Sequence, residues 1–428
     1  MMNSKVKTTQ LQWAIIIATG CMAASVVVLE TRAADEVASP VARWSFEQVR
    51  ERTVADKQTT THKIEVVEPV KLWSGGAVPK SAEIPMLKDV EFHVIKRHEP
   101  QVDGCNWSLG VALAWHKGRL HASYGFNKGS ENTATEEAHG RVSGDGGKTW
   151  GNPFVIDHGE GNLGVSHGVF LSHAGRLWAF HGAFYDKFQR THTRAYVLDE
   201  AAGTWQAKGV VIDAGFWPLQ EPQKMDDGNW IMAGARVSYG YGFVGNLPAV
   251  AISHGVDFTK WNLVVLPCHD SVPVASIWGE SSVIIDGARI LNVSRWGKPF
   301  ALASTSTDYG RTWTPAKPTN LPMSASKPYT GTLSTGERYL ICTTTADSGN
   351  RRSPLTIAVG RPGEATFSRV FVIRHAVFPD GPGVSNPNAS LCYPYAVEHD
   401  GRLYVGYSVK NHRTSELSVI PVNALTAD

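Results

Sequence analysis

Hydrophobic and polar residues alternate in short stretches along most of this chain, and a polar residue followed by glycine separates many of these stretches. Such a turn between two alternating stretches predicts a β-hairpin. From about residue 90 the pattern occurs six times, with central glycines at Gly118, Gly175, Gly228, Gly287, Gly336 and Gly401. These glycines are separated by 57, 53, 59, 49 and 65 residues, which leaves room for a four-stranded sheet in each repeat. The sequence therefore predicts an all-β fold, a six-bladed β-propeller over residues 91–428. A large β-sandwich is the alternative, although it does not require a near-regular repeat.

A second motif follows the hairpin in several repeats. Ser143–Trp150 and Ser306–Trp313 share the form S-x-D-x-G-x-T-W, and residues 253–261 and 199–205 are looser copies. The aspartate of such a segment can accept backbone N–H bonds within its own turn, while the glycine takes a positive φ and the tryptophan packs beside the sheet. We therefore interpret these aspartates and tryptophans as structural.

Composition supports a globular β protein and excludes some functions. The chain has 428 residues, of which 42% are hydrophobic and 19% are charged, so it can bury a large core. Its 41 glycines and 14 tryptophans are typical of a turn-rich, mainly β protein. A formal net charge of +2 without a Lys/Arg run argues against nucleic-acid binding, and no apolar stretch after residue 30 is long enough to span a membrane.

The first 33 residues have the three parts of a secretory signal peptide. Lys5 and Lys7 precede an uncharged stretch, residues 13–29, and small residues follow at 31–34. This pattern predicts export to a secreted or periplasmic location. An uncleaved anchor helix and a lipoprotein site at Cys21 are the alternatives. Residues 34–90 are polar and are expected to form an extension that packs on the propeller.

Four cysteines remain after such cleavage, Cys105, Cys268, Cys342 and Cys392. In an oxidising compartment they allow three disulfide pairings, among which the sequence does not choose. Their spacing does not match a zinc site, so we expect buried or paired structural cysteines.

With these hairpins and aspartate turns, the chain resembles the sialidase (neuraminidase) superfamily, whose six-bladed propellers carry such turns as Asp-box repeats. The resemblance covers roughly residues 91–428. It is specific for the fold and weaker for activity, because Asp boxes also occur in propellers of unrelated function.

The resemblance also implies an active site. Glu280 opens one strand and Arg295 closes the next, as in sialidases, and residues 350–356 are similar to the segment that carries a substrate-carboxylate arginine. Arg352 is the expected arginine there, with Arg351 as the alternate. Tyr393, in Tyr-Pro-Tyr-Ala-Val, is similar to the nucleophilic tyrosine. An arginine can bind a carboxylate with two N–H groups, and Glu280 could take the phenol proton while Tyr393 attacks the anomeric carbon.

The first repeat departs from the sialidase pattern. Residues 106–109, Asn-Trp-Ser-Leu, occupy the stretch where sialidases have an arginine, and the general-acid aspartate after the first hairpin is also absent. Glu131, Glu136 and Glu137 are candidates to replace that acid, and Glu131 has the closest spacing. Arg236 follows Gly228 just as Arg295 follows Gly287, so it could restore a third arginine.

Histidines offer a competing chemistry. His167 precedes the second hairpin and His181 follows it. A neutral histidine with a tyrosine can remove the proton beside a uronate carboxylate, which is the chemistry of polysaccharide lyases. No spacing of these histidines argues for a metal, and no cofactor motif is present.

The sequence thus predicts an exported retaining exo-glycosidase that removes a terminal acidic sugar from glycans, with sialic acid as the family default. Its predicted groups are Tyr393, Glu280, Glu131, Arg295 and Arg352. The alternatives are a lyase or rhamnosidase that acts on uronate-containing glycans through His167 and His181, and a noncatalytic glycan-binding propeller.

Overall fold

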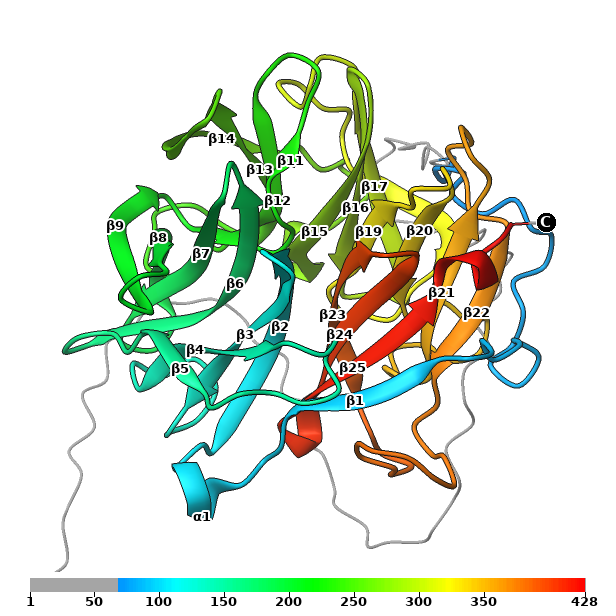
Figure 1. The fold of residues 1–428 in the computed structure, drawn as a ribbon. Helices are drawn as coiled ribbons and strands as arrows, with labels where there is room; N and C mark the ends of the chain where they lie inside the picture. The colour runs from blue at the N-terminus through cyan, green and yellow to red at the C-terminus, as the bar shows by residue number, and fades with distance from the viewer. Residues whose placement is uncertain (1–67, 428) are drawn as a thin grey trace, which may run out of the picture. The chain divides into compact units, whose positions relative to one another are not determined.

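A computed structural model describes residues 68–427 of the chain. These residues form six antiparallel β-sheets arranged around a centre, which confirms the predicted six-bladed propeller (Figure 1). The predicted signal peptide, Cys21 and the first part of the predicted extension lie outside the described residues. Between residues 68 and 427, no helix is long and apolar enough to cross a membrane.

The first three sheets follow one another along the chain. The first contains β2 (Trp107–His116), β3 (Arg119–Asn127), β4 (Glu136–Ser143) and β5 (Phe154–Asp157). The second contains β6 (Leu163–His173), β7 (Arg176–Tyr185), β8 (Gln189–Asp199) and β9 (Thr204–Ile212). The third contains β10 (Phe216–Pro218), β11 (Gln223–Lys224), β12 (Trp230–Arg236), β13 (Leu247–His254) and β14 (Asp257–Val265). Its first strand is thus divided into two short pieces.

The remaining sheets complete the ring. The fourth contains β15 (Ile277–Asp286), β16 (Arg289–Trp296), β17 (Phe300–Ser306) and β18 (Lys317–Pro322). The fifth contains β19 (Tyr329–Thr332), β20 (Arg338–Cys342), β21 (Leu355–Gly360) and β22 (Arg369–Arg374). The sixth contains β23 (Leu391–His399), β24 (Arg402–Val409), β25 (Thr414–Pro421) and β1 (Glu91–Lys96). The helices are short: α1 (Pro100–Asp103), η2 (Val274–Ser276), η3 (Lys410–His412) and η4 (Val422–Ala424).

The predicted glycine hairpins join the two inner strands of each sheet. Gly118, for example, lies between β2 and β3 with φ +74°, and Gly401 lies between β23 and β24 with φ +67°. The first strands contact one another around the centre, as β2 does with β6 and β23. Because neighbouring sheets cover them on both faces, β2 and β6 are buried along most of their length. The expected alternation of buried and exposed residues is therefore absent from these inner strands, whereas the outer strand β9 is largely exposed.

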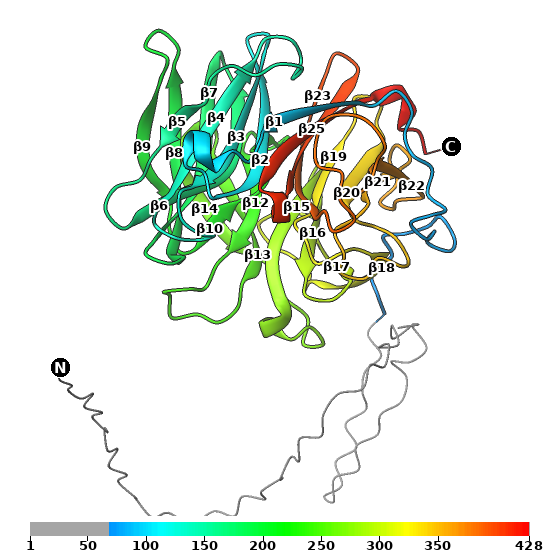
Figure 2. The same cartoon turned by 90° about the horizontal axis from the view of Figure 1, so that it is seen from below.

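The ring is closed by the N-terminal strand of the propeller. β1 is the outermost strand of the sixth sheet and pairs antiparallel with β25, with Glu91 opposite Val419. Figure 2 shows β1 running beside β25 in a second view. The first strand of the propeller, β1, and the last, β25, thus belong to the same sheet. This pairing closes the ring.

Residues 68–90 pack against the fourth and fifth sheets. Leu72 and Trp73 are buried in a cluster with apolar side chains of those sheets. The Asn320 side chain holds this segment, because its Oδ1 accepts the N–H groups of both residues at 2.9 Å and its Nδ2 donates to the Trp73 carbonyl at 2.9 Å. Met86 forms a parallel bridge to Val372 of β22.

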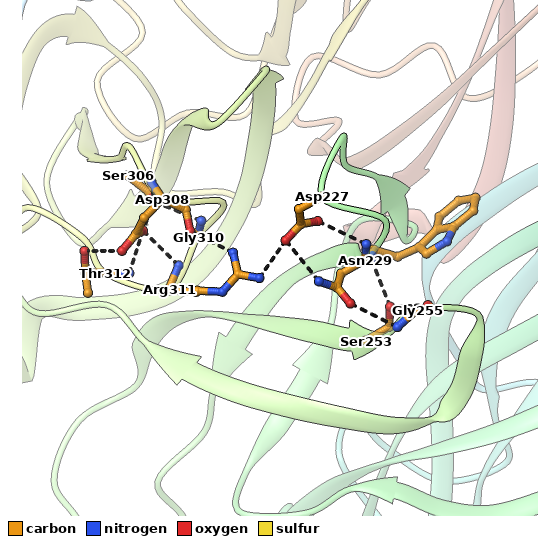
Figure 3. A network of polar contacts seen from close by, with 10 residues as sticks. Asp227, Asn229, Ser253, Gly255, Ser306, Asp308, Gly310, Arg311 and Thr312 are labelled. Atoms are coloured by element: carbon orange, nitrogen blue, oxygen red, sulfur yellow. Dashed lines mark hydrogen bonds and ion pairs between the residues drawn. The ribbon is translucent and has the colours of Figure 1, made fainter.

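The two full Asp boxes connect the third and fourth strands of their sheets, as their structural interpretation predicts. In the fourth sheet, Asp308 accepts the Thr312 N–H at 2.9 Å and the Thr312 hydroxyl at 2.7 Å, while Ser306 Oγ donates to Asp308 at 2.8 Å (Figure 3). Arg311 of the same turn donates to Asp227 of the third sheet at 2.6 Å, so the network also joins neighbouring sheets. Asp145 makes the corresponding bonds to Thr149 in the first sheet.

The four cysteines of the described region carry free thiols. Cys105, Cys342 and Cys392 are buried and Cys268 is partly buried. The structure thus contains none of the three disulfide pairings that the sequence left open.

Candidate active site

A cavity of about 240 Å³ opens at one end of the ring. Its polar and aromatic lining includes Trp107, Glu131, Glu136, Ser166, His167, Phe188, Trp217, Asn246, Trp278, Glu280, Arg295, Arg352, Tyr393 and Lys410. In their sheets, these residues lie near the beginning of the first strand, at the end of the second strand, in the loop that joins the second strand to the third, or at the start of the third strand. In antiparallel sheets this is the end opposite the glycine hairpins. The hairpins and Asp boxes therefore stabilise one end of the propeller, and the candidate site occupies the other.

Irregular first strands bring several of these side chains into the cavity. The pairing register shifts between Val165 and Gly168 in β6, between Ile277 and Ser281 in β15, and between Cys392 and Tyr395 in β23. His167, Glu280 and Tyr393 lie within these irregular segments. A bulge changes the direction of side chains relative to a regular strand, and bulges are common beside active sites. In β2, the shift falls at Gly110, where an added Cβ would lie 2.2 Å from the His167 ring.

Tyr393 and Glu280 form the centre of the site. The Tyr393 hydroxyl donates a hydrogen bond to Glu280 Oε1, and Arg295 Nη1 lies 2.6 Å from Glu280 Oε2. All three side chains are largely buried, with Tyr393 9% exposed. Tyr393 also has φ +54°, a left-handed conformation that is costly for a residue other than glycine. Strained residues of this kind concentrate at functional sites.

The charges around this pair fix the protonation of both groups. Burial raises the pKa of Tyr393 well above its ordinary value, and the negative charge of Glu280 raises it further. Burial alone would also raise the pKa of Glu280, but Arg295 and the hydrogen bond from Tyr393 outweigh it, so that pKa is lowered. The resting pair is therefore a neutral phenol that donates to a carboxylate, which is the arrangement of a nucleophile with its base.

Two arginines predicted from the sequence line the same cavity. Arg295 lies 4.6 Å from the centre of the Trp278 ring, so the half-exposed tryptophan covers its guanidinium. Arg352 Nη2 donates to the Ala325 carbonyl at 2.8 Å, which orients that side chain. Lys410 of η3 adds a third cation to the lining.

Two glutamates on the opposite side differ in environment. Glu131 is partly exposed and its carboxylate lies 3.0 Å from the Lys410 ammonium. Glu136, at the start of β4, is 3% exposed and accepts a hydrogen bond from Ser166 Oγ. Burial raises the pKa of Glu136 to about 7, against the effect of hydrogen bonds from Ser166 and Asn127. Glu136 can thus carry a proton near neutral pH.

His167 lies between these two parts of the site. Its Nδ1 is 3.1 Å from Ser166 Oγ, and its ring packs edge-on against Tyr393 with centroids 5.6 Å apart. Burial, together with the charge of Lys327, lowers the pKa of His167 to about 3, so the imidazole is neutral. Its Nε2 has no hydrogen-bond partner among the described groups.

The structure places the other predicted residues outside the cavity lining. Arg236 packs over the Phe243 ring at 3.4 Å, and the exposed Arg351 donates to the Asp347 carbonyl at 3.0 Å. His181 is completely buried and its Nδ1 lies 2.7 Å from the Ser166 carbonyl oxygen. Glu137 makes an ion pair with Lys128 at 2.6 Å and a hydrogen bond with His139 at 2.7 Å.

Several lining residues were not named from the sequence as site residues. Trp278 directly precedes Gly279-Glu280, so its position beside the predicted base was an available signal. Trp107 lies in the segment noted for its missing arginine. Lys410 belongs to no motif, and only the ring geometry brings it to the first sheet. Among residues 68–427, no cluster of three or more His, Cys, Asp or Glu side chains is placed to hold a metal ion.

Comparison with known proteins agrees with this fold. The model of the BNR repeat-like domain matches residues 141–405. The Hadza microbial sialidase Hz136 has 13% sequence identity and a TM-score of 0.60, with 77% of this chain and 68% of that chain covered. A mutant of the NanB sialidase from Streptococcus pneumoniae has 10% identity and a TM-score of 0.60, with coverages of 78% and 71%.

A third structure is similar over almost all of its length. It is a protein of unknown function from Dyadobacter fermentans with 15% identity and a TM-score of 0.59, covering 78% of this chain and 99% of that one. No curated protein sequence matches the chain. At these identities the structural matches support the fold, whereas the match to the domain model spans more than half of the sequence. The chain therefore belongs to the BNR repeat-like domain family and forms a six-bladed propeller of the sialidase type.

Proposed function

We propose that the protein is a retaining glycoside hydrolase that removes a terminal acidic sugar, with sialic acid as the first candidate, from a glycan. The observation that carries this proposal is the buried Tyr393–Glu280–Arg295 group at the centre of the cavity. A tyrosine nucleophile suits an anionic sugar, because a neutral phenol does not repel the substrate carboxylate as a second carboxylate would.

In the first step, Tyr393 Oη attacks the anomeric carbon and its proton passes to Glu280. The glycosidic C–O bond breaks, and the leaving oxygen takes a proton from an acid in the cavity. In the second step, water gives a proton to the conjugate base of that acid and attacks the anomeric carbon. The bond to Tyr393 then breaks, and Glu280 returns the proton to the phenolate oxygen.

We assign the acid/base role to Glu136, whereas the sequence favoured Glu131. Both glutamates line the cavity, but Glu131 is ion-paired with Lys410. The pKa of Glu136, raised by burial to about 7, allows it to give and take a proton at neutral pH.

The cations of the cavity favour a substrate with a carboxylate. Arg295 and Arg352 can each present planar N–H groups to it, and Lys410 adds a third positive charge in a site without the arginine of the first repeat. The half-exposed face of Trp278 beside Arg295 offers an apolar surface on which a sugar ring can pack.

A uronate-directed lyase is the second candidate, supported by the contact between His167 and Tyr393. His167 is neutral, but its pKa of about 3 makes it a weak base, and His181 lies outside the cavity lining. In that reaction no water is added, and the product contains a C=C bond conjugated to the carboxylate.

The test is to incubate purified protein with a fluorogenic sialoside and, separately, with uronate-containing polysaccharides. Fluorophore release that is lost in Tyr393→Phe and falls by about 10²–10⁴-fold in Glu280→Gln would support the hydrolase. Tyr404→Phe is the matched control, since Tyr404 is a buried tyrosine of the same sheet near the hairpin end. Growth of ultraviolet absorbance from an unsaturated uronate, without sialoside release, would instead support the lyase, and binding without either product would indicate a glycan-binding propeller.

We also propose that the protein acts outside the cytoplasm, on the basis of the predicted signal peptide. Amino-terminal sequencing of protein expressed from the full chain would find a mature terminus near residue 34. A mature protein that begins at residue 1 or 2 would contradict cleavage.

A further inference from the structure

A lysine is buried beside the candidate site without lining its cavity. Lys327 lies two residues before β19, the first strand of the fifth sheet, and is 3% exposed. Lysine is rarely buried to this degree unless its charge has a specific partner. Neither the proposed reaction nor any sequence motif accounts for Lys327.

The lysine contacts the backbone just behind the proposed nucleophile. Its Nζ donates to the Pro394 carbonyl at 2.6 Å, and Pro394 is the residue that follows Tyr393. The Tyr329 hydroxyl, two residues along the chain, lies 2.8 Å from the Ala396 carbonyl oxygen and 2.6 Å from Glu221 Oε2. The fifth sheet thus donates to one carbonyl group of β23 through Lys327 and contacts a second through Tyr329, beside the place where the register of β23 shifts.

The surroundings of Lys327 act on its ammonium group in both directions. Its Nζ lies 5.4 Å and 5.5 Å from the ring centres of Tyr329 and Tyr395, where cation–π attraction contributes. Burial lowers the pKa of Lys327 to about 7, and the carboxylates of Glu280 and Glu221 act in the opposite direction. Glu280 is also the acceptor of the Tyr393 hydrogen bond.

The backbone at Tyr393 needs such support. Its left-handed φ is a conformation that surrounding contacts must hold. Within the irregular segment, Tyr393 and Pro394 fall between the paired residues Cys392 and Tyr395 of β23. Proline has no N–H group, so its carbonyl is the backbone group through which it can be held.

We propose that Lys327 is a positioning residue for the nucleophile, which it serves by holding the Pro394 carbonyl so that the Tyr393 hydroxyl points at Glu280. The role of Tyr393 as nucleophile rests on the function proposed above, whereas the orientation of its side chain does not. Lys327 itself does not touch the substrate.

The matched variants are Lys327→Met and Lys96→Met. Lys96 is also 3% exposed, but it pairs with Asp103 at 2.6 Å and belongs to the outermost strand β1. With an acidic-sugar substrate and rates expressed per folded molecule, Lys327→Met is expected to lower kcat by roughly 10²-fold, the effect of misplacing a reacting group by about 1 Å. KM should change little because the arginines remain, and Lys96→Met should change neither constant. Equal kcat in Lys327→Met and the wild type would overturn the proposal.

A second readout does not depend on activity. With 3-fluorotyrosine incorporated only at position 393, the ¹⁹F resonance reports the environment of the ring. The proposal predicts a displaced or split resonance in Lys327→Met and an unchanged one in Lys96→Met. An unchanged resonance in Lys327→Met would refute the positioning role. If the wild type cleaves no glycoside but the resonance moves as predicted, the proposed function fails and the positioning role stands.

Should Lys327→Met fail to fold, Tyr329→Phe supplies the same test with a smaller change. It removes the hydroxyl that contacts the Ala396 carbonyl and Glu221 Oε2, and leaves the ring in place. A displaced ¹⁹F resonance with a severalfold loss of kcat would support control of the nucleophile by the fifth sheet. A resonance and a kcat equal to those of the wild type would count against it.

Discussion

Replacing Glu136 with glutamine should increase stability at high pH while it impairs catalysis. The carboxyl group is 3% exposed, and burial raises its pKa from an ordinary 4.5 to about 7. Between these two pH values the native protein binds more protons at this site than the unfolded chain does, so stability falls as pH rises through the interval. Each pH unit of difference corresponds to ~1.4 kcal/mol, and the whole interval therefore to ~3 kcal/mol.

Glutamine has a similar shape and does not titrate, so the variant escapes this loss. We expect the free energy of unfolding of Glu136→Gln, relative to wild type, to rise by ~3 kcal/mol between pH 4.5 and pH 8. Urea denaturation followed by tryptophan fluorescence at both pH values measures this difference, from which titrations common to the two proteins cancel. Glu137→Gln is a control that should change little over this interval, because hydrogen bonds from Lys128 and His139 outweigh burial and lower the pKa of Glu137, so its titration affects stability mainly below pH 4.5.

Glu136→Gln should also show the kinetic effect of losing a general acid. A substrate with a poor leaving group needs protonation of its leaving oxygen and should lose about 10²–10⁴-fold in rate, whereas an activated aryl glycoside should lose much less in the first step. A stability difference that does not change between pH 4.5 and pH 8 would refute the protonated state of Glu136. Equal losses for both leaving groups would refute its role as the acid.

Three further changes probe other parts of the structure. Asp308→Ala removes the acceptor of two Thr312 hydrogen bonds and should lower the free energy of unfolding by about 1–3 kcal/mol in urea denaturation, with kcat unchanged because the turn lies at the hairpin end. Gly110→Ala places a Cβ 2.2 Å from the His167 ring at a φ of +74°, so circular dichroism melting should show a lower midpoint and the folded fraction should have reduced kcat. Lys410→Met removes one cation from the cavity and should raise KM for an acidic sugar a fewfold, an effect of about 1 kcal/mol that should fade with added salt in steady-state assays. For Gly110→Ala, a melting midpoint or a kcat equal to that of the wild type would contradict the close contact between residue 110 and His167. For Lys410→Met, an unchanged KM would contradict a role of this cation in binding the substrate.

The repeat architecture could be predicted from the sequence because its signals are local. Each glycine hairpin lies within one sheet, and the Asp-box bonds connect residues two to four positions apart. Closure of the ring could not be predicted in this way. The residues of β1 and β25 pair across more than 300 positions, and the sequence of Glu91–Lys96 alone does not indicate its partner.

The site was partly accessible to sequence reasoning. Tyr393 and Glu280 were named from motif resemblance, and the structure joins them by a hydrogen bond across 113 positions. Arg236 has the same spacing from its hairpin glycine as Arg295. The Arg236 guanidinium, however, packs over the ring of Phe243 in the following loop. Spacing along a strand therefore did not determine where that side chain lies.

Two lysines near the site could not be predicted from the sequence, for a different reason. Lys327 and Lys410 belong to no recognisable motif, and each reaches the site through contacts between sheets. Lys327 binds a carbonyl of the sixth sheet, and Lys410 approaches Glu131 of the first sheet. Such contacts depend on how neighbouring sheets pack, which hydrophobic patterning does not encode at the level of single residues.

The most direct test of the account is to trap the bond that it requires at Tyr393. An activated acidic sugar that carries fluorine beside the anomeric carbon should slow release of the covalent intermediate, so that mass spectrometry of the quenched, digested protein can locate the sugar. We predict a mass increase on the peptide that contains Tyr393 in the wild type, and no increase in Tyr393→Phe. Turnover of the sugar with the label on another residue, or with no covalent label at any time, would contradict a tyrosine nucleophile in this propeller.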